Sequence, residues 1–397
     1  MLRRMTTSSG SMTTPVVGIV GGGQLARMMY QAAIPLGLRP RIMVERDDDA
    51  AALIAADVTI GSPTSASDLR AFAAGCDVLT FDHELVDAES LDSLERSGRA
   101  VRPGASMVAL AQDKRCQRAR FSRLGLPVPA HRVVERGSDI DAFGREHGWP
   151  VVLKAGRGGY DGRGVWVLKD QQEAAALAGE LADRQIPLLA ERWIPIDREL
   201  AALVARRPSG EMVVYPVVET VQRDGMCHEV VAPAPIPPGV SAEAERLARV
   251  IAEESELVGM MALELFLTGD ELMINEIAAR PHNSGHLTIE GAETSQFEQH
   301  LRAVLDWPLG STALTAPAVA MVNLIGPVAG DAGDPTARRD EALAIPGVHL
   351  HLYGKAYRAG RKLGHVTALG ATIDEARARA RRAASALAGE DRDGMSA

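Results

Sequence analysis

The strongest constraint on folding is the segment at residues 259–286, GMMALELFLTGDELMINEIAARPHNSGH, in which Gly269-Asp270 separates two apolar runs. A Gly-Asp pair between apolar runs is a turn signal, so we expect the two runs to form a β-hairpin. A turn centred on residue 270 places Glu264 and Glu276 opposite each other on one face of the hairpin. Like charges that oppose each other in a sheet are destabilising, and burying them among apolar side chains costs more.

A divalent cation would remove this conflict, because hard oxygen ligands are how proteins commonly hold Mg²⁺ beside phosphates. We therefore expect Glu264 and Glu276 to bind Mg²⁺, with Mn²⁺ as the alternative ion. The competing interpretation is a pair of solvated glutamates on an open sheet face, which needs no ion.

A second unusual segment is KAGRGGYDGRGV at residues 154–165, which is rich in glycine and carries Lys154, Arg157 and Arg163. A segment this flexible and cationic is not a core element, whereas its glycines allow backbone amides to approach an anion closely. Lys154, at the end of the preceding strand, can place a positive charge on a phosphate. The alternative is a mobile hairpin tip without a ligand. Together with the paired glutamates, the run predicts a nucleoside triphosphate held between a flexible lid and a metal-bearing hairpin.

The N-terminal part of the chain alternates strands and helices. We expect strands at residues 16–20, 41–45 and 77–82, and a helix that GGGQL at 21–25 opens and Gly37 ends. This alternation predicts a parallel sheet with crossover helices, and the glycine turn offers amides to an anion. The turn also resembles a dinucleotide-binding fingerprint, with Ala26 in place of the third glycine and Glu45 as the acid after the second strand. A nicotinamide-dependent dehydrogenase is therefore the alternative from another class, although it leaves the lid and the glutamate hairpin unexplained.

Length and charge limit the class of protein. The 397 residues exceed what one hydrophobic core usually supports, so two or three domains are expected. No apolar run approaches the ~20 residues that span a bilayer, and the first residues lack the apolar core of a secretory signal. Three dispersed cysteines suit a reducing cytoplasm, and a net charge of −9 disfavours a general nucleic-acid binder. We therefore expect a cytoplasmic protein that binds neither membranes nor nucleic acids.

Changes of pattern along the chain divide it into five parts. We expect a disordered leader over residues 1–14, an α/β domain over 15–115, a central domain over 116–310 with the lid at 154–165, a small C-terminal domain over 311–390 and a disordered tail over 391–397. In the central domain, residues 198–207 and 212–222 are expected to form two long antiparallel strands joined by a turn at 208–210.

Two further polar clusters suit a second substrate. KAYRAGRKLGHV at residues 355–366 gathers basic side chains around two glycines, which suits either a phosphate separate from the nucleotide or a solvated basic turn. RPHNSGH at 280–286 follows the strand that carries Glu276, so we expect it to bring the second substrate to the γ-phosphate. His282 in this run is the candidate proton shuttle at neutral pH.

These motifs together resemble the N5-carboxyaminoimidazole ribonucleotide synthase family, ATP-grasp enzymes of bacterial and fungal purine biosynthesis. The matching pieces are GGGQLARMM, KAGRGGYDGRGV, ALELF with INEIAARPHNSGH, SQFEQHLRAV and YGKAYRAGRKLGHV, which follow the family's order along nearly the whole chain. The resemblance implies an ATP-grasp fold of mixed α/β and α+β class, between an N-terminal parallel-sheet domain and a small C-terminal domain. It also implies a homodimer that uses ATP and Mg²⁺ without biotin. The implied reaction carboxylates 5-aminoimidazole ribonucleotide with bicarbonate through carboxyphosphate, and it releases ADP and phosphate.

Carried over residue by residue, the resemblance implies three groups of site residues. The ATP-binding residues would be Lys114, Lys154, Gly159, Tyr160, Asp161, Gly162, Arg163, Gly164, Val165, Glu191, Arg192, Trp193, Ile194, Glu199, Asn275 and Glu276. The ribonucleotide would contact Gln24, Leu25, Glu84, Tyr160, Asp161, Lys355 and either Arg361 or Lys362. The catalytic residues would be Arg280 and His282, which match positions implicated in bicarbonate activation and amine deprotonation, with Tyr160 and Asp161.

Four positions depart from the family's pattern, one of them Ala279, which replaces a frequent Pro. Lys114 stands where many members have Arg, which keeps the charge and loses the bidentate geometry. Gln222 replaces a His that often contacts the nucleotide, and Ala278 stands where other ATP-grasp ligases use Asn as a third metal ligand. Within the same fold, the alternatives are a related ATP-grasp carboxylase and a formate-dependent formyltransferase. Dependence of phosphate release on the ribonucleotide would distinguish them.

Overall fold

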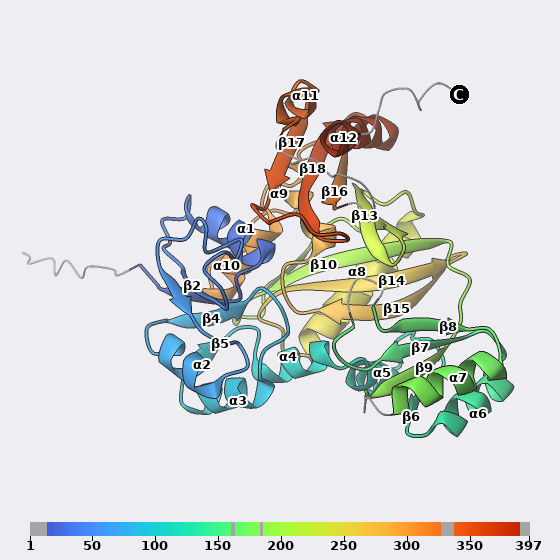
Figure 1. Cartoon of the computed structure of the whole chain (residues 1–397). Helices are drawn as coiled ribbons and strands as arrows, with labels where there is room; N and C mark the ends of the chain where they lie inside the picture. Colours follow the sequence, from blue (N-terminus) through green and yellow to red (C-terminus); the bar gives the residue numbers. More distant parts are fainter. Residues whose placement is uncertain (1–13, 160–162, 183–185, 327–336, 390–397) are drawn as a thin grey trace, which may run out of the picture.

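The computed structural model describes residues 14–159, 163–182, 186–326 and 337–389, which form three β-sheets with helices packed against them (Figure 1). In Figure 1 the N-terminal sheet lies at the left, a small four-stranded sheet lies at the lower right, and the last strands of the large sheet rise at the top. No helix within these described ranges is both long and apolar enough to cross a bilayer.

The N-terminal sheet is parallel throughout. Its elements are β1 (Val17–Val20), α1 (Gln24–Ala33), β2 (Arg41–Val44), β3 (Val58–Ile60), α2 (Ala66–Ala73), β4 (Val78–Phe81), α3 (Ala88–Arg96) and β5 (Ala100–Val101), with strand order β3-β2-β1-β4-β5. Every residue of β1 and of β4 is buried, as expected for parallel strands that helices cover on both faces. The predicted parallel sheet with crossover helices is confirmed. Helix α1 ends earlier than expected, and Gly37 lies in the turn after it with a φ of +71°.

Two helices, α4 (Ala105–Gln112) and α5 (Lys114–Arg123), lead to the four-stranded sheet. Its elements are β6 (His131–Val134), α6 (Gly137–His147), β7 (Val151–Ala155), β8 (Val165–Leu168), α7 (Gln171–Ala182) and β9 (Leu188–Arg192), in the order β6-β9-β7-β8. Strands β7 and β8 pair antiparallel, with Lys154 opposite Val165 at the two ends of the glycine run. Gly158 and Gly164 both adopt a φ of +74°, which only glycine accepts without strain.

The large sheet has nine strands. The elements of this part are β10 (Arg198–Arg206), β11 (Met212–Val214), β12 (Val218–Arg223), β13 (Met226–Ala232), α8 (Pro238–Glu254), β14 (Gly259–Thr268), β15 (Glu271–Ala278), a 3₁₀ turn (Asn283–Gly285), α9 (Thr288–Gly291), α10 (Gln296–Val304), β16 (Ala318–Ile325), α11 (Arg339–Leu343), β17 (Val348–Leu352), β18 (Lys362–Gly370) and α12 (Ile373–Ala388). The strand order is β15-β14-β10-β12-β13-β16-β18-β17, and β11 pairs with β10. Because β13 pairs with β16, the C-terminal strands continue the same sheet.

The single long strand expected over residues 212–222 is wrong. It is two strands, β11 and β12, and Pro216 lies between them. Proline has no N–H to donate to a ladder, which explains the interruption. Both strands nevertheless pair antiparallel with β10, so the predicted direction of this hairpin is confirmed.

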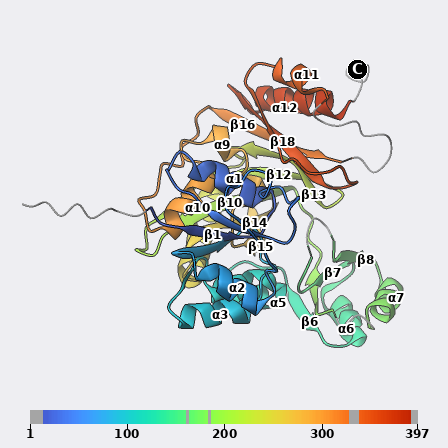
Figure 2. The same ribbon diagram turned by 60° about the vertical axis from the view of Figure 1, so that its left-hand side comes forward.

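Helix α10 joins the N-terminal domain to the large sheet, and Figure 2 shows it beside α1. Its Phe297 and Leu301 are buried in one cluster with residues of α1 and β1. On another side of the helix, His300 accepts the Met260 N–H at Nδ1 (3.0 Å), and its Nε2 lies 2.6 Å from Thr80 Oγ1. His300 therefore links β4 to the start of β14, and the end of β15 pairs with this part of β14.

Candidate active site

The hairpin of β14 and β15 places two carboxylates opposite each other, as predicted. Its turn is a two-residue one at Gly269-Asp270, and a regular ladder from this turn would put Glu264 opposite Asn275. A β-bulge shifts the register by one residue at this point, so Glu264 pairs with Glu276 instead. The predicted pairing is therefore confirmed, but it depends on a bulge that the turn pattern does not contain.

Cationic and polar groups surround the two carboxylates. The Lys114 ammonium forms an ion pair with Glu276. His282 Nε2 lies 3.1 Å from Glu264 Oε1, and Asn275 Nδ2 donates to Glu264 Oε2 at 3.2 Å. Burial opposes ionisation of Glu264, but the hydrogen bond and charge of His282, with Lys114 and Asn275, outweigh it and lower the pKa of Glu264 to about 2. Glu264 is therefore an anion at neutral pH.

This donor set fits a hard divalent cation. Two opposed carboxylates supply the oxygen ligands that Mg²⁺ prefers, and Mg²⁺ usually takes waters or substrate phosphates in its other positions. Across the part of the chain that the structure describes, no group of three or more His, Cys, Asp or Glu side chains forms a metal cage. Glu264 and Glu276 would therefore hold the ion with help from the phosphates of a nucleotide.

Lys154 lies at the centre of a buried ion-pair network. Its Nζ is 2.8 Å from Glu191 Oε2 and donates to Asn275 Oδ1 at 3.0 Å. Arg118 contacts the other carboxylate oxygen of Glu191 at 2.6 Å and donates to the Asn275 carbonyl at 2.7 Å. Burial opposes ionisation of Glu191, but Lys154 and Arg118 together lower its pKa to about 2. Sequence reasoning missed Arg118, because nothing in the local sequence shows which of the four arginines on α5 points inward.

The segment from Glu191 to Ile194, which is expected to bind ATP, divides at the end of β9. Glu191 lies inside the strand, between β6 and β7, and its side chain is committed to the buried network. Trp193 and Ile194 lie beyond the strand, and Trp193 is 43% exposed. The ATP contacts of this segment thus stay a prediction, and they concern its backbone and Trp193 more than the Glu191 carboxylate.

Glu199 lies on β10 between β12 and β14. Burial, together with the nearby charge of Glu264, raises the pKa of Glu199 from 4.5 to about 7. The folded state therefore binds a proton that the unfolded state has released, and stability falls as pH rises from about 4.5 to about 7.

Glu199→Gln is expected to remove this loss of stability. Without nucleotide, the variant and the wild type should be similarly stable near pH 4, and the variant should be more stable by about 3 kcal/mol at pH 8. Urea unfolding at both pH values measures the difference, with the exposed Glu253→Gln as control. A difference between variant and wild type that does not change with pH would contradict the assignment.

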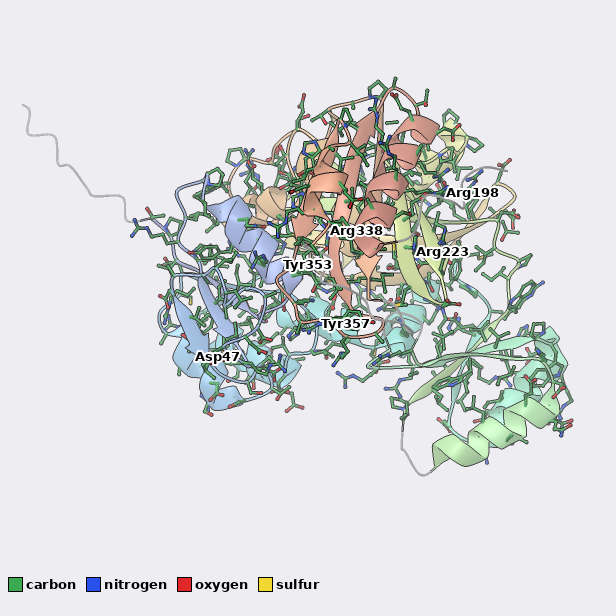
Figure 3. The ribbon with its side chains drawn as sticks, turned by 45° about the horizontal axis from the view of Figure 1, so that its top comes forward. Asp47, Arg198, Arg223, Arg338, Tyr353 and Tyr357 are labelled. Carbon is green, nitrogen blue, oxygen red and sulfur yellow. The ribbon has the colours of Figure 1, made fainter. Side chains whose placement is uncertain are left out.

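The side chains expected at the ribonucleotide converge from three segments. Lys355, in the loop between β17 and β18, hydrogen-bonds to Gln24 at the start of α1. Glu84 lies just after β4 and pairs with Arg280, with 2.8 Å between Oε2 and Nε. Figure 3 labels Tyr353 beside this loop, where the C-terminal part meets the N-terminal domain. The predicted residues from both ends of the chain are thus brought together.

The other predicted ribonucleotide residues differ in accessibility. Arg361 and Lys362 are partly exposed where the loop enters β18. The Leu25 side chain is buried in the core of the N-terminal domain, so only the main chain of Leu25 can contact a ligand. Lid residues 160–162 (Tyr160, Asp161 and Gly162) lie outside the described residues, and their roles stay predictions.

The glycine turn before α1 does not offer the anion site that the sequence predicts. Asp82, just after β4, accepts the Gly23 N–H at Oδ2 at 2.6 Å. A Cβ on Gly21 would lie 1.8 Å from Asp82 Oδ1, so this carboxylate fills the space over the turn. The Asp82 carboxylate therefore takes the place at the start of α1 that a bound anion would occupy. Sequence reasoning missed Asp82, although FDHE places it two residues before Glu84 at the end of a strand.

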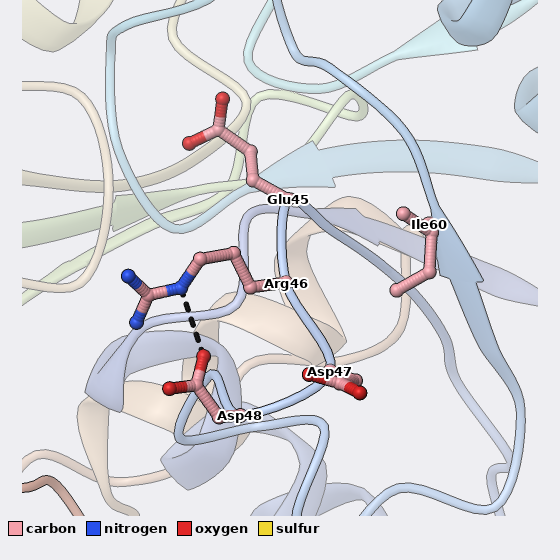
Figure 4. Close-up of a pocket in the computed structure, with 5 residues that line it drawn as sticks. All are labelled: Glu45, Arg46, Asp47, Asp48 and Ile60. Carbon is pink, nitrogen blue, oxygen red and sulfur yellow. Dashed lines mark hydrogen bonds and ion pairs between the residues drawn. The ribbon is translucent and has the colours of Figure 1, made fainter.

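Glu45, the acid of the dinucleotide pattern, lines a separate hollow (Figure 4). The lining residues are Glu45, Arg46, Asp47, Asp48 and Ile60. Arg46 Nε lies 2.8 Å from Asp48 Oδ1, and the carboxylates in the lining outnumber this one cation. The hollow therefore suits no dinucleotide phosphate, and the dehydrogenase alternative loses its support.

Three protein-family models match the chain in order. A ribonucleotide synthetase preATP-grasp domain matches residues 12–112, an ATP-grasp domain matches residues 119–297, and a phosphoribosylaminoimidazole carboxylase C-terminal domain matches residues 319–379. These ranges correspond to the parallel sheet, the part that carries the glutamate hairpin, and the strands from β16 onward.

Similar proteins cover nearly the whole chain. The N5-carboxyaminoimidazole ribonucleotide synthase of Mycobacterium tuberculosis is 47% identical over 381 residues, which cover 94% of this chain and 88% of that protein. The enzyme of that name from Corynebacterium ammoniagenes is 42% identical over 379 residues, 94% of this chain and 92% of that protein.

Solved structures agree with these relatives. The N5-carboxyaminoimidazole ribonucleotide synthetase of Thermus thermophilus is 37% identical, with a TM-score of 0.85 over 95% of this chain and 99% of that chain. The N5-carboxyaminoimidazole synthase of Aspergillus clavatus, solved with ADP and 5-aminoimidazole ribonucleotide, is 33% identical. Its TM-score is 0.86, over 94% of this chain and 98% of that chain.

Proposed function

Because this chain belongs to the N5-carboxyaminoimidazole ribonucleotide synthase family of ATP-grasp ligases, we propose that it carboxylates 5-aminoimidazole ribonucleotide in purine biosynthesis. The reaction consumes ATP and bicarbonate and yields N5-carboxyaminoimidazole ribonucleotide, ADP and phosphate. The observation that carries the proposal is the meeting of the opposed glutamates, the Lys154 network and the Arg280–Glu84 pair at one junction.

At the ATP end, the charged side chains are held in place before the nucleotide binds. Glu191 and Asn275 hold the Lys154 ammonium in place. An ammonium in this position suits a phosphate oxygen. Glu264 and Glu276 are the candidate Mg²⁺ ligands, and a bound ion would offset the charge that develops on the transferring phosphoryl group. Fixed charges of this kind stabilise a transition state without having to reorganise.

At the second-substrate end, Arg280 is the candidate bicarbonate ligand, because Glu84 holds its guanidinium beside the hairpin. A bicarbonate oxygen attacks the γ-phosphorus and ADP leaves, which gives carboxyphosphate. Carboxyphosphate then breaks into CO₂ and phosphate, and the exocyclic amine of the ribonucleotide attacks the carbon of CO₂. His282 is the candidate base that accepts the amine proton.

We further propose a homodimer in the cytoplasm that needs neither biotin, nor nucleic acid, nor a membrane, as the resemblance of the sequence motifs implies. Sedimentation velocity at micromolar concentration tests the dimer. A species with the mass of one 42.2 kDa chain would contradict it.

Phosphate release from ATP and Mg²⁺ tests the reaction, with and without bicarbonate and 5-aminoimidazole ribonucleotide. We expect strong stimulation only when both are present. Stimulation when formate replaces bicarbonate would instead support the formyltransferase alternative. If the ribonucleotide gives no stimulation while ATP still binds, the ATP-grasp assignment stands and the proposed substrate is wrong.

A further inference from the structure

Gln296, the first residue of α10, reaches the loop that carries His282. Its side chain is fully buried. Gln296 Oε1 accepts the His282 N–H at 2.9 Å, and Gln296 Nε2 donates to the His282 carbonyl at 2.8 Å. One amide group therefore clamps both main-chain polar groups of His282.

The rest of the Gln296 side chain is equally committed. Its Nε2 lies 3.1 Å from His286 Nδ1, so the two amide hydrogens have one acceptor each. A Cβ on Gly285 would lie 2.3 Å from Gln296 Oε1, which shows how closely the loop main chain packs against the amide. The main chain of Gln296 is anchored too, because its N–H donates to Thr288 Oγ1 at 2.9 Å.

The His282 ring is held separately from its main chain. Its Nε2 lies 3.1 Å from Glu264 Oε1, and its Nδ1 lies 2.9 Å from Ser284 Oγ. These two contacts fix the rotation of the ring. The Gln296 clamp fixes the position of the main chain to which the ring is attached. A displacement of the main chain would therefore move the ring relative to Glu264, whichever rotation the ring adopts.

We infer that Gln296 is a positioning residue that holds His282 in place for proton transfer. The inference rests on the proposed function, in which His282 accepts the amine proton. Gln296 has no direct part in that step, since each polar atom of its side chain contacts the His282–His286 loop. A misplacement of about 1 Å at a reacting group can cost about 10²-fold in rate.

Gln299, three residues further along α10, offers a matched control. It is also fully buried, and its amide clamps Gly310 in the same way. Gln299 Oε1 accepts the Gly310 N–H at 2.8 Å, and Nε2 donates to the Gly310 carbonyl at 2.8 Å. The two glutamines thus make the same two-point clamp on different loops, and Gln296 makes one further bond, to His286.

The test compares Gln296→Met with Gln299→Met in ribonucleotide-stimulated phosphate release. Both variants should lower the melting temperature to a similar extent, because each loses the same two-point clamp. We expect only Gln296→Met to lower kcat, by about 10²-fold, with KM for ATP and ribonucleotide changed less than about threefold. Gln296→Glu keeps the acceptor for the His282 N–H and serves as a second variant if the Met variant does not fold.

A double-mutant cycle with His282→Asn separates positioning from a purely structural role. If Gln296 acts through His282, the double variant should lose no more activity than His282→Asn alone. Additive losses, equal kcat values for the two Met variants, or failure of both Gln296 variants to fold would overturn the inference. A wild-type enzyme that the ribonucleotide does not stimulate would instead overturn the proposed function.

Discussion

Glu264→Gln is expected to lower ribonucleotide-stimulated phosphate release by about 10²–10³-fold, which is the usual cost of losing one group that stabilises the transition state. The substitution keeps the size of the side chain and removes one of the two opposed carboxylates. The fold should survive, because a like-charge pair becomes a neutral–anionic pair. Steady-state phosphate release and thermal unfolding of the same preparation measure the two halves of this prediction.

Glu271→Gln, at the exposed end of the same hairpin, is the matched control and should keep wild-type activity. A second readout is independent of turnover. Since the charge of Glu264 contributes to the raised pKa of Glu199, Glu264→Gln should lower the pKa of Glu199 and weaken the loss of stability toward pH 7. Wild-type activity in Glu264→Gln would refute the metal assignment.

Arg118→Met is expected to destabilise the central domain by about 3–5 kcal/mol. Arg118 is fully buried, and it binds both the Glu191 carboxylate and the Asn275 carbonyl. Its removal leaves the ionised Glu191 with Lys154 alone and deprives a main-chain oxygen of its donor. Removing one partner of a buried ion pair is costly because the remaining charge is poorly compensated.

Urea unfolding, followed by the fluorescence of the tryptophans in this part of the chain, measures the loss. Arg123→Met on the same helix is the control, because Arg123 is exposed and its removal should change stability by less than about 0.5 kcal/mol. Activity should fall as well, since the Arg118 network restrains Lys154 and Asn275. Equal stability of the two variants would show that the buried network contributes nothing to folding.

Local sequence patterns were sufficient to predict structural features that depend on residues close together in the chain. Two apolar runs around Gly269-Asp270 predicted the hairpin and the opposed glutamates, and the strand–helix alternation predicted the parallel sheet. Both features repeat with the period of a strand or a helix, so a short window contains most of the signal. The β-bulge that pairs Glu264 with Glu276 is the part that such a window does not contain. The same approach was wrong for residues 212–222, where Pro216 outweighed an otherwise strand-like run.

Long-range pairing decided what local patterns could not. The sequence by itself determined most of the elements and the family, and it predicted a set of residues to carry the chemistry. Only the tertiary structure decided which of them are free to meet a ligand: Glu191 proved to be a buried counterion, and Asp82 fills the turn that was expected to hold a phosphate. Arg118 and Glu191 are 73 residues apart, and Glu84 and Arg280 are 196 apart. Such residues become partners because distant helices and strands pack against one another. The periodicity of a short segment does not contain that packing.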